Sequence, residues 1–520
     1  MGKVSRFINR TLAAVGLRKV KNSGIVPGSD SFRILKEWIE SPLKANASLD
    51  WDLRTKLYSL RLRARALALN NPIVRQYLQL LEQNVVGPTG MRLQAQVRNN
   101  DGNLNTTIND KIEVAWDDFW RNPWADGRMS GVQGEQLLLR TMAVDGEAFV
   151  RLIRSSKYRY GLKLQMIDPD LVDHQLNQPR GANGENEIRL GIEVDEYGAP
   201  AAYWCWSSVP QDINLTVPRQ RIRIPAEEIL HLYDPERSGQ TRGITWLNSV
   251  MLPLSILDGY VEATLLAART AACSIPMFRH TDASLYSVDA GSQPPQFNVE
   301  LNPGGGLTLP PGLEMQQFDP SKPTTGFAEF TKATKRWISS GLNVSYNALA
   351  NDLEGVNYSS MRSGLLIERD SWQALQQMFI DRFKRPVHEW FIRAALLSPD
   401  LVLDSRDPRK FLAARFTPRG WKWIDPLKEV NAAVIAIENG LGSRTNYLGE
   451  QGDDFEDICE ELVDEKRIAD ENGLSFIGAA VTALDVRKQT QEEETGDNQP
   501  GDAPTDTNTA QALHLARRRS

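Results

Sequence analysis

The stretch ITWLNSVMLPLSILDGYVEATLLAARTAA, residues 244–272, is the most informative segment for the fold. Its apolar positions recur alternately every three and four residues, the period of an amphipathic helix, at Leu247, Val250, Leu254, Leu257, Val261, Thr264, Ala268 and Ala271. At 1.5 Å per residue, such a segment forms a rod of about 40 Å. Pro253 either kinks this rod or marks its start. By itself the pattern is typical of a buried core helix. Charged residues interrupt the apolar run of about 18 residues that a bilayer requires, so no membrane span is predicted.

A second helix is predicted over residues 323–342, after a short insert. The insert, 281–322, is rich in Gly, Pro, Ser and Asn, and its strand candidates are FNVEL (297–301) and GLEMQQF (312–318). The helix places one set of side chains on one side, namely Phe327, Phe330, Thr334, Trp337, Ile338 and Leu342. A basic set, Lys332, Lys335 and Arg336, lies mostly on another side. Two helices therefore flank a compact insert.

The segment LEGVNYSSMRSGLLIERDSW, residues 353–372, runs from a loop into a long helix. Gly355 and Asn357 suit a turn, and Ser359 or Ser360 suits a helix cap. From there a stripe of period 3.6 is predicted at Tyr358, Met361, Leu365, Trp372, Leu375, Phe379, Phe383, Val387, Trp390 and Ala394. Pro386 should kink or break this helix. The opposite face, left to solvent or another subunit, carries Arg362, Glu368, Arg369, Gln373, Gln376 and Arg382.

The N-terminal half changes from a helical period to a strand period. Residues 53–86 and 108–120 read as helices, and Pro72 starts a new helix within the first of these ranges. The second range carries Ile112, Ala115, Trp116 and Phe119 on one face, as expected of a core helix. Between 147 and 233, short β-prone runs alternate with turns. The expected fold class is therefore α+β and predominantly helical.

Composition and the chain ends limit the possible classes of protein. A chain of 520 residues with 41% hydrophobic and 24% charged residues is a multi-region globular protein. Its net charge of −6 argues against a protein that coats nucleic acid with a basic surface. Cys205, Cys273 and Cys459 form no CxxC pair, so neither a disulfide framework nor a zinc site is predicted. Residues 1–21 read as a basic amphipathic arm, 432–437 and 457–472 as short helices, and the acidic tail from Gln491 as disordered.

A search for catalytic motifs finds no convincing active site. Gly239 to Gly243 (GQTRG) lacks the lysine of a P-loop, and His388-Glu389 lacks the second histidine of a zincin. No metal or cofactor is predicted. The paired acids of DGE (145–147) and DPD (168–170) could in principle do acid/base work, but their position beside Gly and Pro favours turn chemistry.

Several motifs in order along the chain resemble the lambda-type portal proteins of tailed bacteriophages. They are RLRARALALNNPIVRQYLQLLEQNVVGPTG (61–90), DGEAFVRL (145–152), LGIEVDEYGAPAAYW (190–204), IPAEEILHLYDPERSGQTRGITWL (224–247), NYSS with Arg362 (357–362) and GWKWIDPLKE (420–429). Each is weak alone, and together they are specific. The resemblance implies a structural protein and no enzyme.

The resemblance also implies a domain order in a dodecameric ring around a channel for double-stranded DNA. It implies a basic arm and start of the wing over 1–50, the wing over 51–243, a first stem helix over 244–272 and a small α/β clip over 273–322. The domain order continues with a second stem helix over 323–342, a tunnel loop over 343–356, and the long wing helix and following strands over 357–425. It ends with a helical crown over 426–486 and a disordered tail over 487–520.

The implied functional residues lie in the tunnel loop and on the second stem helix. The loop would present Asn351, Asp352, Glu354, Gly355 and Asn357 to DNA. Its acidic side chains would not attract the phosphates, so they would not oppose sliding of the DNA. Lys332, Lys335 and Arg336 would touch the DNA backbone without reading sequence, or would simply form a solvated helix face.

The implied partners are other copies of the chain, the large terminase subunit, the major capsid protein and scaffold, and head-completion and neck proteins. The implied location is a capsid vertex of the virion, after assembly in the host cytoplasm. Two alternatives stay open. One is a metal-dependent nuclease or hydrolase that uses Asp145, Glu147 and Asp168. The other is a capsid scaffold without a channel.

Overall fold

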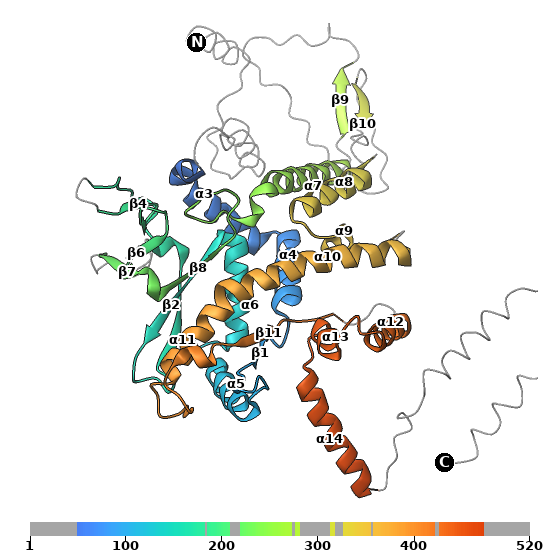
Figure 1. Ribbon diagram of the computed structural model, residues 1–520. Helices are drawn as coiled ribbons and strands as arrows, with labels where there is room; N and C mark the ends of the chain where they lie inside the picture. Colours follow the sequence, from blue (N-terminus) through green and yellow to red (C-terminus); the bar gives the residue numbers. More distant parts are fainter. Residues whose placement is uncertain are drawn as a thin grey trace, which may run out of the picture. The chain divides into compact units, whose positions relative to one another are not determined.

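A computed structural model describes residues 49–181, 185–207, 219–272, 276–280, 313–317, 326–354, 357–421 and 426–472. This part of the chain is mixed helix and sheet with helix predominating, as predicted (Figure 1). The chain divides into two compact units, Met1–Asn431 and Ala432–Ser520. Gly355, FNVEL (297–301), Cys273, the arm 1–21 and the tail from Gln491 lie outside the described residues.

The first helices of the larger unit follow the predicted pattern. α3 (Leu49–Asn70) ends just before α4 (Pro72–Leu81). The Asn71 side chain caps α4 by accepting hydrogen bonds from the N–H groups of Ile73 (3.0 Å) and Val74 (3.3 Å). Pro72 occupies the first turn, where its missing N–H costs no helical bond. The prediction that Pro72 starts a second helix is confirmed.

The next two helices continue the core. A π-helical segment, Glu82–Val86, extends α4. α5 (Thr106–Arg121) buries Ile112, Ala115, Trp116 and Phe119, the face predicted for it. α6 (Gly131–Asp145) starts with a capping box between Ser130 and Gln133 and ends at Gly146, whose φ is 87°. The helix leads directly into the central strand of a sheet.

Two antiparallel sheets form the β-rich region predicted between 147 and 233. The first has the order β3-β2-β8, with β2 (Glu147–Arg154) between β3 (Leu162–Ile167) and β8 (Ile229–Tyr233). The second has the order β4-β5-β6-β7, with bounds Glu187–Arg189, Ile192–Val194, Pro200–Trp206 and Arg221–Pro225. A small apolar cluster that includes Phe149, Tyr203 and Ile224 joins the two sheets. A separate ladder pairs β1 (Arg92–Ala95) with β11 (Ala414–Thr417).

The helix predicted from residue 244 begins later and is less buried than a core helix. α7 (Met251–Ala272) follows a 3-10 turn at Trp246–Ser249, so Pro253 marks its first turn. Leu254 and Leu257 are buried, whereas Leu265 and Leu266 are 57% and 64% exposed. The expectation of a buried core helix is therefore correct only for the first turns of α7. By length and composition alone, 251–269 is apolar enough to span a membrane, because its two acids lower the mean hydropathy only modestly. Core helices of soluble proteins share this property.

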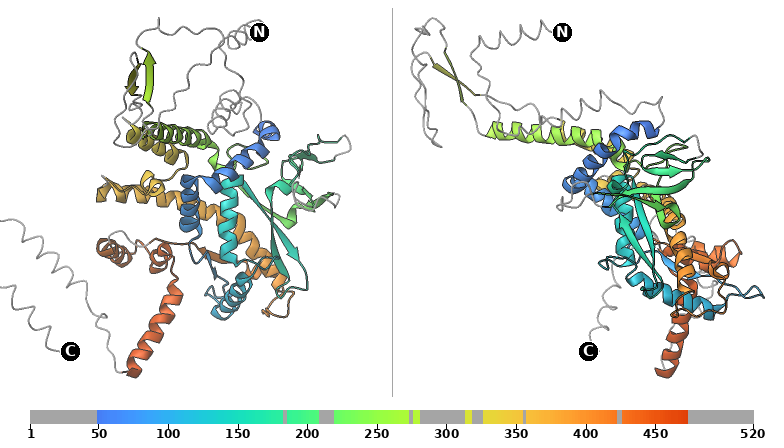
Figure 2. Two further views of the ribbon diagram at one scale, coloured as in Figure 1. Left: turned by 180° about the vertical axis from the view of Figure 1, so that it is seen from behind. Right: turned by 90° about the vertical axis from the view of Figure 1, so that its left-hand side faces the viewer.

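The second predicted helix, α8 (Phe327–Gly341), packs along α7 (Figures 1 and 2). The Tyr260 ring of α7 lies 5.7 Å from the Phe327 ring and 4.3 Å from the Phe330 ring. α8 buries Thr334 and Ile338, but Trp337 is 55% exposed. Trp337 lies at the edge of the predicted stripe, where a turn of 100° per residue carries it past the contact with α7. A β-hairpin of β9 (Pro276–His280) and β10 (Leu313–Gln317) lies between these helices in sequence, and β10 falls within the predicted GLEMQQF strand.

The long helix after residue 357 consists of three segments. α10 (Tyr358–Phe379) passes through a π-helical segment, Ile380–Lys384, into α11 (Arg385–Ala395). Pro386 thus interrupts the regular helix without breaking it, because the π segment absorbs the missing N–H. The extra residue moves the buried stripe by one position, to Phe391 and Ala395 in place of Trp390 and Ala394.

Two polar residues assigned to the outer face of this helix are buried. Glu368 is 8% exposed and Gln376 is 2% exposed. The Gln376 side-chain amide donates to the carbonyl oxygens of Asn84 (3.0 Å) and Arg419 (2.9 Å). Gln376 therefore joins the π segment after α4 to the chain that follows β11. The prediction that both residues face solvent is wrong, because each satisfies a buried backbone group.

The C-terminal helices are α12 (Pro426–Glu438), α13 (Arg444–Gln451) and α14 (Phe455–Asn472). The predicted helices at 432–437 and 457–472 are confirmed, and α13 was not predicted. Ser443 caps α13 by accepting a hydrogen bond from the N–H of Asn446 at 3.2 Å, and Gly452 ends it in a left-handed conformation. α13 packs against α14 within the smaller unit.

Candidate functional site

The segment after α8 is a structured loop. Asn343, with φ 54°, turns the chain out of α8, and Ser345 caps the five-residue helix α9 (Tyr346–Ala350) by accepting a hydrogen bond from the N–H of Ala348 at 3.2 Å. Asn351, with φ 50°, ends α9. Asparagine suits both ends because it tolerates the left-handed region better than most residues.

The first half of this loop is anchored to α10 and α4. The Glu368 carboxylate on α10 accepts hydrogen bonds from the Ser345 backbone N–H (3.3 Å) and the Ser345 hydroxyl (3.0 Å). The Asn343 amide donates to the Ser371 hydroxyl at 3.3 Å, and the Gln76 amide on α4 donates to the Ala348 carbonyl at 3.4 Å. The helix α9 is therefore held at a defined position beside the base of α8.

The second half of the loop folds back on the basic face of α8. The Tyr346 hydroxyl donates to Asp352 at 2.6 Å, and Lys332 Nζ lies 3.6 Å from the same carboxylate. The hydrogen bond from Tyr346 lowers the pKa of Asp352, and Lys332 adds to this effect. The Arg336 guanidinium lies 5.4 Å from the centre of the Tyr346 ring. Three residues predicted for the site, Lys332, Arg336 and Asp352, are thus brought together.

The other predicted site residues are less tightly held. Lys335 is half-buried and has no carboxylate partner among the described residues. The Glu354 N–H donates to Asp352 at 3.1 Å, and the Glu354 side chain is exposed. Asn357 is exposed just before α10, and Asn351 is the C-cap of α9. Beside the neutralised Lys332–Asp352 pair, the loop presents one exposed acid, Glu354, and α8 presents two cations, Lys335 and Arg336, that have no carboxylate partner among the described residues.

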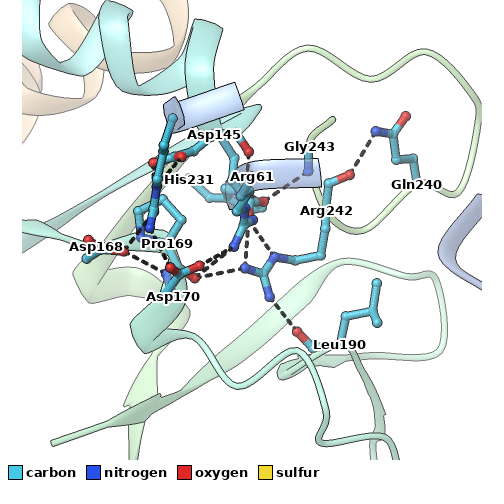
Figure 3. A network of polar contacts seen from close by, with 12 residues as sticks. Arg61, Asp145, Asp168, Pro169, Asp170, Leu190, His231, Gln240, Arg242 and Gly243 are labelled. Atoms are coloured by element: carbon cyan, nitrogen blue, oxygen red, sulfur yellow. Dashed lines mark hydrogen bonds and ion pairs between the residues drawn. The ribbon is translucent and has the colours of Figure 1, made fainter. Parts of the chain in front are cut away.

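A second polar cluster forms where the two paired-acid motifs meet α3 (Figure 3). Its centre is Glu147, at the start of β2 and 0% exposed. Glu147 accepts from Arg61, from Arg242 Nε at 2.7 Å and from the Gly243 N–H at 2.9 Å, and His231 Nε2 lies 2.9 Å away. Burial opposes the charged form, but Arg242 and Arg61 lower the pKa of Glu147 well below its ordinary value. Glu147 is therefore an ionised anchor inside the protein.

The backbone comes unusually close around this anchor. A Cβ atom on Gly243 would lie 2.1 Å from the Gly146 carbonyl oxygen, and one on Gly146 would lie 2.3 Å from the Ile244 carbonyl carbon. Only glycine fits at such a distance. The end of the GQTRG segment, Arg242 and Gly243, thus packs against the Glu147 carboxylate.

The remaining acids of the cluster surround Arg65, one turn after Arg61 on α3. Arg65 lies 2.7 Å from Asp145, 2.6 Å from Asp170 and 3.2 Å from Asp168. Asp168 also accepts from the N–H of Asp170 at 2.8 Å, which is the turn chemistry predicted for DPD. The arginines of this cluster were not predicted, although RLRAR places Arg61 and Arg65 on one helix face. Among the described residues, no three His, Cys, Asp or Glu side chains are arranged to hold a metal ion.

His388 of the zincin-like dipeptide lies inside the apolar core. Its ring is 2% exposed and meets the Trp116 ring edge-on at 5.7 Å. Burial, with a smaller contribution from Lys384, lowers the pKa of His388 to about 4. Next to it, Lys384 forms a buried ion pair with Glu135 at 2.6 Å and lies 3.7 Å from the centre of the Trp120 ring. Both groups are structural, as predicted for His388.

Comparison with known proteins identifies what the chain is similar to. Residues 33–376 match the family described as phage portal protein, lambda family. A probable portal protein of Halomonas phage phiHAP-1 is 34% identical over 458 residues, which cover 86% of this chain and 88% of the relative. Portal protein B of Escherichia phage lambda is 23% identical, over 74% of this chain and 78% of the relative. Among solved structures, a chain from the neck of a native GTA particle with C12 symmetry aligns with a TM-score of 0.46 and 14% identity, over 77% of this chain and 94% of that chain.

Proposed function

This chain belongs to the lambda family of phage portal proteins, and from that premise we propose that its copies assemble into a ring, a dodecamer, through which double-stranded DNA enters and leaves a phage capsid. Family membership is the observation that carries the proposal. The ring would sit at one capsid vertex after assembly in the host cytoplasm. It would dock the large terminase subunit, the major capsid protein and scaffold, and head-completion and neck proteins.

The exposed apolar side chains on the two paired helices support assembly through α7 and α8. Leu265 and Leu266 on α7 and Trp337 on α8 are exposed in the single chain. Burying such side chains against a neighbouring copy stabilises an oligomer by roughly 25 cal/mol per Å² of apolar surface. We assign α7 and α8 to the stem, the segment between them to the clip, 51–243 and 357–425 to the wing, and 426–486 to the crown.

The anchored loop after α8 supports a role at the channel. Its tip would present Asn351, Asp352, Glu354, Gly355 and Asn357 to passing DNA. A wall of acids and paired cations lets DNA slide, because it neutralises few phosphates and releases few counterions. Lys335 and Arg336 would supply the weak, sequence-independent contacts to the backbone.

The geometry of the acidic motifs favours this structural role over the nuclease alternative. Asp145 and Asp170 pair with Arg65, and Glu147 pairs with Arg61 and Arg242. These guanidinium groups stand where a catalytic metal ion would have to bind. If the nuclease alternative were correct, the purified protein would cleave DNA with Mg²⁺ or Mn²⁺, and neutral substitutions of Asp145 or Glu147 would abolish the cleavage.

Negative-stain electron microscopy of the purified full chain tests the ring. Rings with a central hole are expected, with twelve-fold symmetry in class averages. Solid particles would instead support a scaffold without a channel, and monomers at all concentrations would contradict assembly without partners.

A further inference from the structure

The tip of the β2–β3 hairpin lies near the end of α11 (Figure 1). Between these two segments is a concave surface that shares no residue with the loop after α8. It is a cavity of about 600 Å³ and is lined by residues from two segments, 154–161 (without Tyr160) and the part of 390–400 made up of Trp390, Arg393, Ala394 and 397–400. This volume falls within the usual range for a ligand pocket, about 300–1,000 Å³. All lining residues belong to the described part of the larger unit.

The lining of this pocket is basic. Arg154, Lys157, Arg159 and Arg393 line it together with one acid, Asp400. Arg159 is already compensated, because it lies 2.5 Å from Asp118 and 3.5 Å from Asp400. In contrast, neither Arg154 nor Lys157 has a carboxylate partner among the described residues. Arg393 has only an exposed contact with Glu389 at 3.4 Å, which is worth little. One side of the pocket therefore carries uncompensated positive charge.

The other side of the pocket is apolar. Leu397 is 85% exposed at its rim, and Ala394 and Pro399 lie beside it. Leu397 therefore adds an exposed apolar contact surface beside the cations. The combination suits a ligand that alternates negative and apolar groups.

The Trp390 ring holds two of the cations in place. The Arg154 and Arg393 guanidinium groups lie 4.9 Å and 5.2 Å from the ring centre. These contacts pre-orient both guanidinium groups. The N–H edge of Arg154 has no carboxylate partner among the described residues, and that of Arg393 has only the exposed contact with Glu389, so both can bind carboxylates of a ligand. The two guanidinium groups also occupy the ring, so it offers no free platform for stacking a base. The pocket therefore favours carboxylates on a peptide over nucleic acid.

We propose that this pocket is a docking site for an acidic peptide segment of another protein. Carboxylates of the segment pair with Arg154, Lys157 and Arg393, and an apolar side chain of the segment packs against Leu397. The site is independent of the proposed channel, because none of its residues belongs to α7, α8 or the loop that follows α8.

Fluorescence anisotropy with a fluorescein-labelled twelve-residue peptide of alternating Glu and Leu tests this site. The full chain should bind the peptide saturably, with a dissociation constant below about 100 μM, well within the range of a specific contact. Arg154→Gln combined with Arg393→Gln should weaken binding at least about tenfold, because two charge-assisted contacts are lost. Leu397→Ser should weaken it severalfold. Arg409→Gln, an exposed arginine outside the pocket, is the matched control and should leave binding unchanged.

Three outcomes would overturn the proposal. They are the absence of saturable binding to the wild-type chain, equal binding of a peptide with Gln in place of Glu, and equal or tighter binding of an oligothymidylate of the same length. Thermal unfolding of each variant, expected to match the wild type because the substituted residues are exposed, separates loss of the site from loss of the fold.

Discussion

Replacing Glu147 with Gln should destabilise the β-rich region strongly, although the two side chains have the same shape. Glu147 carries the negative charge that compensates Arg61 and Arg242, whose side chains are 1% and 0% exposed. Removing one partner of a buried ion pair costs about 3–5 kcal/mol, because the other charge stays buried and uncompensated. The amide NH₂ would also face donors, the two arginines at the position of Oε1 or the Gly243 N–H at the position of Oε2.

Hydrogen exchange followed by mass spectrometry measures this loss locally. Peptides covering β2 and β8 should exchange roughly a hundredfold to several thousandfold faster in Glu147→Gln, since each 1.4 kcal/mol is tenfold. Asp168→Asn is the matched control. Asp168 side-chain exposure is 44%, and its partner Arg65 is 29% exposed. Such an exposed pair contributes about 1 kcal/mol or less, so the control should exchange no more than about fivefold faster.

A double variant separates charge from packing. Adding Arg242→Met to Glu147→Gln removes one of the uncompensated cations, so exchange should slow again relative to Glu147→Gln alone. Arg61 keeps Asp170 as a second partner, at 3.3 Å. If Glu147→Gln behaves like Asp168→Asn, or if the double variant is as unstable as the sum of the single variants, then Glu147 is not the electrostatic anchor described above.

Two further predictions concern other buried charges, Glu368 and Lys384, and a third concerns the pH dependence of Glu147. Glu368→Ala removes both hydrogen bonds to Ser345. The free energy of local opening over residues 345–350 should therefore fall by about 1–3 kcal/mol, which is seen as faster amide exchange, while α5 keeps its protection. Lys384→Met leaves Glu135 buried without a partner and should lower the free energy of urea unfolding by about 3–5 kcal/mol, and adding Glu135→Gln should restore most of it. The pKa of Glu147 is lower in the folded than in the unfolded protein, where it is about 4.3. The stabilisation of the fold by ionised Glu147 is therefore fully present above about pH 4.3 and is lost as the pH falls through the folded-state pKa. The difference in exchange rate between wild type and Glu147→Gln should stay constant from about pH 5 to 8 and shrink only in acid.

Local sequence patterns are enough to predict the type and order of most helices and strands. Asn71 followed by Pro72 marks a helix start that depends on two adjacent residues only, so the structure reproduces it. The stripe on α5 and the strands between 147 and 233 follow in the same way from periods of 3.6 and 2 residues. Family membership was also predictable, because motifs in a fixed order identify a family even where each motif is weak.

Which polar residues are buried, and which groups they bind, depends on contacts between segments that are distant in the sequence. Glu368 and Gln376 occupy positions that look solvent-facing in the helical pattern, yet their partners are backbone groups far away in sequence. The same holds for Arg61, whose distance from Glu147 along the chain hides their contact. A period shows which side chains share a face of a helix or strand. It does not show whether that face meets water, an apolar core or an opposite charge, since this depends on how distant segments pack together.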